Sequence, residues 1–75
     1  MPDKTLDTKG LTCPLPILKA RKALSELPPG AKLEVLSTDP GSVPDFTAFC
    51  ATTGNLLVEH SQDGSIYRFV IEHRA

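Results

Sequence analysis

Apolar residues recur every three or four positions in two stretches of the chain, the spacing that places side chains on one face of an α-helix. The first stretch comprises Ile17, Ala20, Leu24 and Leu27, with Leu18 widening the stripe. Two prolines and a glycine follow directly and cannot continue a helix. We therefore predict an amphipathic helix over residues 14–27.

The second stretch comprises Phe46, Phe49, Cys50 and Thr53, and it ends at Gly54, a natural C-terminal stop. Ser42 and Asp45 precede it with the spacing of a capping box, in which each side chain accepts a hydrogen bond from the other residue's backbone N–H group. These signals predict a second helix, over residues 42–53, that is capped by Ser42 and Asp45.

The remaining apolar residues form short runs that are typical of β-strands. We predict four strands, over residues 4–8, 31–38, 56–60 and 66–73. Leu6 in the first strand, and Leu33 and Val35 in the second, are expected to point inward. Asp63-Gly64, between the last two runs, is a strong hairpin signal. The last strand is apolar on both faces, so the pattern leaves its buried side open.

The resulting order β-α-β-α-β-β predicts one domain, residues 1–75, with the architecture of a two-layer α/β (α+β) sandwich. The first strand–helix–strand unit implies a right-handed parallel crossover, whereas the hairpin is antiparallel. We therefore expect a four-stranded mixed sheet with both helices on one face. A chain of 75 residues buries only about 60% of its unfolded surface, so any chemistry should lie near the surface.

Composition argues against several classes of function. A net charge of −1 does not favour non-specific nucleic-acid binding, which relies on a basic surface. No apolar run approaches the ~18 residues of a membrane span, and the first residues lack the apolar core of a signal peptide. We therefore predict a cytoplasmic protein that contacts neither membrane nor nucleic acid directly.

The chain has two cysteines, Cys13 and Cys50, which should both be free thiols in a reducing cytoplasm. A metal site would require both of them together with His60 and His73, and no Cys-x-x-Cys pair is present to anchor it. We therefore expect no metal and no cofactor. Cys50 lies on the apolar face of the second helix and is expected in the core, and the two histidines are expected at the surface.

Cys13 comes at the start of the first predicted helix, immediately before Pro14. Proline is favoured at the first helical position, which makes Cys13 the expected N-cap, and Pro16 is tolerated in the same turn. The sulfur would then face the free N–H groups of Leu15 and Ile17 and the positive end of the helix dipole, which favour a nucleophilic thiolate. Because the two prolines remove two donors, we expect the pKa of Cys13 to fall only to about 6.5–7.5.

Taken together, these residues resemble the TusA (SirA-like) sulfur-carrier family. The resemblance rests on Leu6-Asp7, Gly10-Leu11, Cys13-Pro14-x-Pro16, Arg21-Lys22, Pro29-Gly30, Asp39-Pro40, Asp45, Phe49-Cys50, Asp63-Gly64 and Tyr67-Arg68. It covers residues 5–71 and implies a two-layer α/β sandwich and a sulfurtransferase that acts as a persulfide carrier. In that family the motif cysteine, here Cys13, accepts sulfane sulfur from a cysteine desulfurase or rhodanese. It then passes the sulfur to a reactive cysteine of an acceptor protein of the DsrE/TusD-like type.

The resemblance also bears on three cations of the first helix. By themselves, Lys19, Arg21 and Lys22 are typical of a solvated helix face. As parts of the family pattern they become candidates for docking an acidic partner surface. We expect the carrier to be a monomer, with Cys13 as the nucleophile.

One position departs from the family pattern. Members of the tRNA-thiolation branch carry glutamate between the two prolines, where this chain has Leu15. The missing carboxylate makes a thiolate at Cys13 more stable and the surrounding rim more apolar. The pathway therefore stays open between tRNA 2-thiolation, cytoplasmic sulfur oxidation and molybdenum-cofactor sulfuration.

Two functions from other classes remain as alternatives. A non-catalytic regulatory or nucleic-acid-binding module fits the size of the domain, but the chain has no basic surplus and few aromatic residues. A redox thiol switch would form a sulfenate on Cys13 or a Cys13–Cys50 disulfide. No resolving cysteine lies close to Cys13 in sequence, which counts against it.

Overall fold

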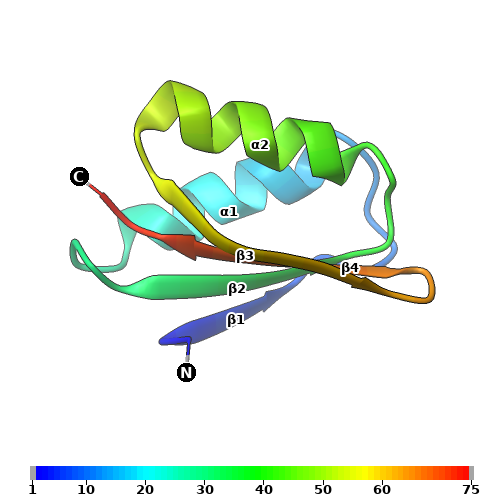
Figure 1. Cartoon of the computed structure of the whole chain (residues 1–75), viewed down its shortest axis with the longest axis horizontal. Helices are drawn as coiled ribbons and strands as arrows, with labels where there is room; N and C mark the ends of the chain where they lie inside the picture. Colours follow the sequence, from blue (N-terminus) through cyan, green and yellow to red (C-terminus); the bar gives the residue numbers. More distant parts are fainter. Residues whose placement is uncertain (1, 75) are drawn as a thin grey trace.

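Two helices lie over one face of a four-stranded sheet in the computed structural model, which describes residues 2–74 (Figure 1). In chain order the elements are β1 (Lys4–Asp7), α1 (Leu15–Ser25), β2 (Lys32–Ser37), α2 (Ser42–Thr53), β3 (Leu56–Asp63) and β4 (Ile66–Glu72). This arrangement confirms the predicted two-layer α+β fold. No helix within residues 2–74 has the length and apolar character needed to cross a membrane.

The strand order in the sheet is β1-β2-β4-β3. β1 pairs in parallel with β2, so that Leu6 lies opposite Val35, and β4 pairs antiparallel with β2 on one side and β3 on the other. Because β1 and β2 run in the same direction, their carboxyl ends meet at one edge of the sheet. β1 is followed by α1 and β2 by α2. Both helices therefore begin at that edge, and they run side by side (Figure 1).

The core lies between the helices and the sheet. Its buried members include Ala20, Leu24, Leu33, Val35, Phe46, Phe49, Cys50, Phe69 and Ile71. Phe46 stacks on Phe69 with 4.7 Å between the ring centroids, and it meets Phe49 edge-on at 6.4 Å. The contact with Phe46 shows that Phe69 faces the helices, which settles the side of β4 that the sequence pattern left open.

The face of the sheet away from the helices carries a polar network. Arg68 donates hydrogen bonds to the carboxylates of Glu34 and Glu59, and the Thr5 hydroxyl also donates to Glu34. The guanidinium of Arg68 holds the pKa of the Glu34 carboxyl below its usual value. All four strands are thereby linked across a face that no helix covers.

The ends of several elements differ from the prediction. α1 ends at Ser25 rather than at residue 27, because Glu26 and Leu27 close the last turn with tighter bonds to residues 23 and 24. Leu18 does not widen the apolar stripe, since 53% of it is exposed, and Thr53 is also exposed. β3 continues to Asp63, which leaves a two-residue turn whose first residue is Gly64, with φ of 60°.

The predicted capping box at the start of α2 is wrong. The Ser42 hydroxyl is buried and pairs with the Ser37 hydroxyl at 2.7 Å, while Gly41 is the N-cap. The Ser42 N–H donates to the backbone oxygen of Asp39, so this donor has no need of a side-chain cap. The carboxylate of Asp45 therefore remains available for a different contact.

Replacing Cys50 by Ser should destabilise the fold. The Cys50 side chain is 6% exposed, and burial raises the pKa of its thiol, so the residue packs as a neutral apolar group. A hydroxyl with poor partners at this position should lower the free energy of unfolding by about 1–3 kcal/mol in urea titrations. Ala51→Ser, at the exposed neighbouring position, is the matched control, and equal stability of the two variants would contradict the core assignment.

Candidate functional site

The turn before α1 presents Cys13 to solvent. α1 begins at Leu15 and its N-cap is Pro14, so Cys13 lies one residue before the cap rather than at it, which corrects the prediction. The Leu15 N–H donates to the backbone oxygen of Thr12 at 2.9 Å. This N–H group is therefore not available to stabilise the sulfur, contrary to the prediction. Pro16 is buried in the first turn, whereas the side chain of Cys13 is exposed.

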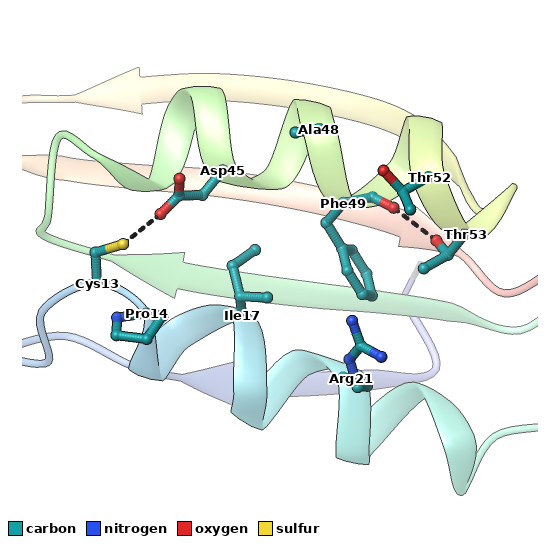
Figure 2. A pocket seen from close by; sticks show the side chains of 9 residues that line it. All are labelled: Cys13, Pro14, Ile17, Arg21, Asp45, Ala48, Phe49, Thr52 and Thr53. Carbon is teal, nitrogen blue, oxygen red and sulfur yellow. Dashed lines mark hydrogen bonds between the residues drawn. The ribbon is translucent and has the colours of Figure 1, made fainter.

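Two aspartates from the second half of the chain contact Cys13. Its Sγ donates to Oδ2 of Asp45 at 2.7 Å, and its backbone N–H donates to Oδ2 of Asp39, also at 2.7 Å. Asp45 lies in the first turn of α2 (Figure 2). Asp39 lies in the loop between β2 and α2. The other carboxylate oxygen of Asp39 accepts from the Gly41 N–H, a bond within the loop that orients this carboxylate towards the Cys13 backbone.

These carboxylates raise the pKa of Cys13 above its ordinary value. The hydrogen bond to Asp45 is the largest cause, followed by partial exclusion of water and by the negative charges of Asp45 and Asp39. The predicted fall in this pKa is therefore wrong. The raised pKa favours the protonated thiol of Cys13 over the thiolate, with its proton directed at the Asp45 carboxylate.

A groove of about 300 Å³ runs from the sulfur along the seam between α1 and α2. It is lined by Cys13, Pro14, Ile17 and Arg21 from the side of α1, and by Asp45, Ala48, Phe49, Thr52 and Thr53 from α2. Cys13 and Asp45 form one end, and Arg21 and Phe49 lie towards the other (Figure 2). The Arg21 guanidinium carbon is 5.6 Å from the centroid of the Phe49 ring, within range of a cation–π contact.

Apart from Pro16, which is buried, the predicted site residues separate into two groups. Pro14 and Arg21 line the groove together with Cys13. Leu15 is 43% exposed, and Lys19 and Lys22 are also exposed; none of these three lines the groove. Together with Leu18 they follow the i, i+3, i+4, i+7 spacing of one helix face, so α1 presents an apolar and then a basic stretch to solvent.

Sequence reasoning missed the contribution of α2. The sequence pattern predicts a capping role for Asp45 and a core position for Phe49, and it places neither beside Cys13. The topology contains the signal, because helices that follow two parallel neighbouring strands begin at the same edge of the sheet. An acidic residue in the first turn of the second helix then lies close to the start of the first.

The site offers an exposed thiol and a proton acceptor within hydrogen-bond distance. Asp45 can accept the thiol proton as the sulfur attacks an electrophile, and this requires no histidine. Within residues 2–74, no group of three or more His, Cys, Asp or Glu side chains is arranged to hold a metal ion. The chemistry that these residues support is thiol exchange at Cys13.

Comparison with known proteins gives consistent results. A family model described as sulfurtransferase TusA matches residues 4–73. The chain is 50% identical over 70 residues to the sulfur carrier protein TusA of Allochromatium vinosum, covering 93% of this chain and 92% of that protein. The crystal structure of a SirA-like protein from Desulfitobacterium hafniense superposes with a TM-score of 0.83 at 27% identity, over 96% of this chain and 99% of the other.

Replacing Asp45 by Asn should lower the pKa of Cys13, because the carboxylate stabilises the protonated thiol by its hydrogen bond and by its charge. The rate of alkylation by iodoacetamide, measured against pH in a Cys50→Ser background, should therefore reach its midpoint at lower pH. Glu26→Gln removes an exposed carboxylate at the far end of α1 and serves as the control. A midpoint that stays in place in Asp45→Asn would show that this carboxylate does not govern the thiol.

Proposed function

The chain belongs to the TusA sulfurtransferase family, and we propose that it is a sulfur carrier that holds sulfane sulfur as a persulfide on Cys13. The exposed thiol of Cys13, hydrogen-bonded to Asp45, is the observation that carries this proposal. Transfer between two proteins requires a sulfur that a partner's cysteine can reach. Cys50 is buried in the core and does not meet this requirement.

Loading is a thiol exchange without net oxidation. The sulfur of Cys13 attacks the outer sulfur of a donor Cys–S–S–H, and the bond between the two donor sulfurs breaks. The proton of the Cys13 thiol moves to Asp45 and then to the departing donor thiolate. Unloading repeats this step with the roles changed, since an acceptor thiolate attacks the outer sulfur and Cys13 becomes the leaving group.

The partners we propose are proteins with a reactive cysteine. A cysteine desulfurase or rhodanese acts as donor, and a DsrE/TusD-like protein acts as acceptor, in a reducing cytoplasm that keeps Cys13 free. The same transfer step serves tRNA 2-thiolation and sulfur oxidation, and the identity of the acceptor distinguishes them. Leu15 places an apolar side chain, rather than a carboxylate, at the surface that these partners would meet.

We also propose that the cations of α1 help to dock these partners. Lys19 and Lys22 are exposed on the helix that presents Cys13, and Arg21 reaches the groove beside it. Positive charges so placed attract an acidic surface over a distance limited by the Debye length, about 8–10 Å at ordinary salt. Such steering acts on the association rate more than on the lifetime of the complex.

Replacing Cys13 by Ser should abolish sulfur loading and leave the fold intact. After incubation with cysteine desulfurase and cysteine, the intact mass of the wild-type protein should increase by one sulfur atom. Cys50→Ser should still load, despite its lower stability, because only the exposed sulfur is used. A redox switch would lose two hydrogen atoms instead, and a binding module would show no change in mass. Loss of loading in Cys50→Ser at normal stability would refute the assignment.

Reversing one charge, in Lys22→Glu, should slow association with the cysteine desulfurase at low salt and have little effect at high salt. Stopped-flow association rates over a salt series measure this effect. Lys32→Glu makes the same change in net charge at the start of β2, away from the edge where the helices begin, and is the control. If both variants depend on salt as the wild type does, Lys22 belongs to an ordinary solvated face.

A further inference from the structure

We propose that the groove between α1 and α2 binds the persulfide of a low-molecular-weight thiol that carries a carboxylate remote from its sulfur. Cys13 would then be loaded directly from this small molecule as well as from a donor protein. The inference rests on the proposed function, since it uses the same sulfur on Cys13. It adds a substrate class and gives Arg21 a role in recognising it.

The charges along the groove favour one orientation of a bound molecule. At the sulfur end, Asp45 accepts the thiol proton and Asp39 holds the backbone of Cys13, so this end repels a carboxylate. Towards the other end, the guanidinium of Arg21 lies over Phe49 and forms no ion pair with any side chain of residues 2–74. A cation–π contact uses none of the guanidinium N–H donors, so they can still bind a carboxylate in a bidentate manner. An occupant should therefore place its sulfur at Cys13 and its negative charge at Arg21.

The length of the groove restricts the thiol. α1 rises about 9 Å between Leu15 and Arg21, which sets the scale of the distance between the reacting sulfur and the guanidinium. Free cysteine carries its carboxyl carbon three bonds from the sulfur, and its carboxylate would lie beside Asp45. A thiol of tripeptide size, extended over about 10 Å, spans the distance.

The walls and volume of the groove suit a molecule of this size. Ile17, Ala48 and Phe49 give it apolar sides, and polar groups are concentrated at its ends. Its volume of about 300 Å³ is at the lower limit of typical small-molecule sites. A protein partner has a different surface available, because Cys13 is exposed beside Leu15 and the outer face of α1.

The loading step balances in atoms and electrons. Cys13–SH and R–S–SH give Cys13–S–SH and R–SH. The bond from the Cys13 sulfur to the sulfane sulfur forms while the S–S bond of the small molecule breaks. The thiol proton passes through Asp45 to the leaving thiolate, and no oxidant or reductant is consumed.

Glutathione persulfide is the probe, because it is a tripeptide-sized thiol derivative with carboxylates remote from its sulfur. Loading of the wild-type protein, followed by intact mass over time, should saturate with its concentration. The half-saturating concentration should rise on the order of tenfold or more in Arg21→Gln, as expected for loss of a charged hydrogen-bond pair. Lys32→Gln removes a charge outside the groove and should behave like the wild type.

The diethyl ester of glutathione persulfide provides a test that does not depend on the folding of a variant. The wild-type protein should bind the ester as weakly as Arg21→Gln binds the parent compound. Combining ester and variant should add little further loss, because both changes remove the same contact. The inference would be overturned if loading does not saturate and is equal for the wild-type protein with the ester, the wild-type protein with the parent compound, and Arg21→Gln with the parent compound. The groove would then be a binding site for a segment of a partner protein.

Loading by inorganic polysulfide and by cysteine desulfurase distinguishes this failure from failure of the proposed function. If both reagents load Cys13 while glutathione persulfide shows no saturation, the groove assignment is wrong and the carrier function stands. If neither reagent loads Cys13, the proposed carrier function is wrong, and the proposed role of the groove in loading Cys13 is wrong with it.

Discussion

The parallel pairing of β1 with β2 is the constraint on which the site depends. It directs both strands towards one edge of the sheet, and each continues there into a helix. The turn before α1 and the first turn of α2 therefore lie together, and the hydrogen bond between Cys13 and Asp45 can form. The core below supports this arrangement, because Phe46 of α2 stacks on Phe69 of the central strand β4 and holds the second helix in place.

The state of the sulfur follows from this geometry and suits a carrier. A strongly acidic thiol would be ionised at all times but would be a weaker nucleophile, since nucleophilicity falls with pKa. Here the carboxylate of Asp45 raises the pKa of Cys13, which favours the protonated thiol, and it can receive the proton during attack. In the persulfide that we propose, Sγ has no proton left to donate, and the hydrogen bond to Asp45 is lost. The loaded and unloaded carriers would then differ at the surface that a partner meets.

The groove and the outer face of α1 divide the helix between two kinds of contact. Arg21 turns inward over Phe49, whereas Lys19 and Lys22 remain on the solvent face with the exposed Leu15. In sequence the three cations are almost adjacent and are equivalent by composition. Only their angular positions around the helix, about 100° apart for consecutive residues, distinguish a groove residue from two surface residues.

The order of the elements follows from the sequence alone, because the spacing of apolar residues within each segment depends only on whether that segment buries one face of a helix or of a strand. The sequence also places Leu33 and Val35 in the core, and it places Cys13 at the start of a helix. It does not locate the ends of α1 and β3, which depend on turn bonds and on cross-strand pairing. The buried side of β4 also required a neighbour, since both faces of this strand carry apolar residues and the contact with Phe46 shows which of them faces the helices.

The chemistry of the site depends on contacts between residues that are distant in the sequence. Local rules consider the groups adjacent to Cys13 in the chain, and these favour thiolate through the helix dipole and the amide of Leu15. In the folded protein that amide bonds to Thr12, and the sulfur instead meets Asp45, which is 32 residues away in sequence. The pKa of a thiol responds to the charges nearest in space, and a contact made by strand pairing is not visible in the local sequence.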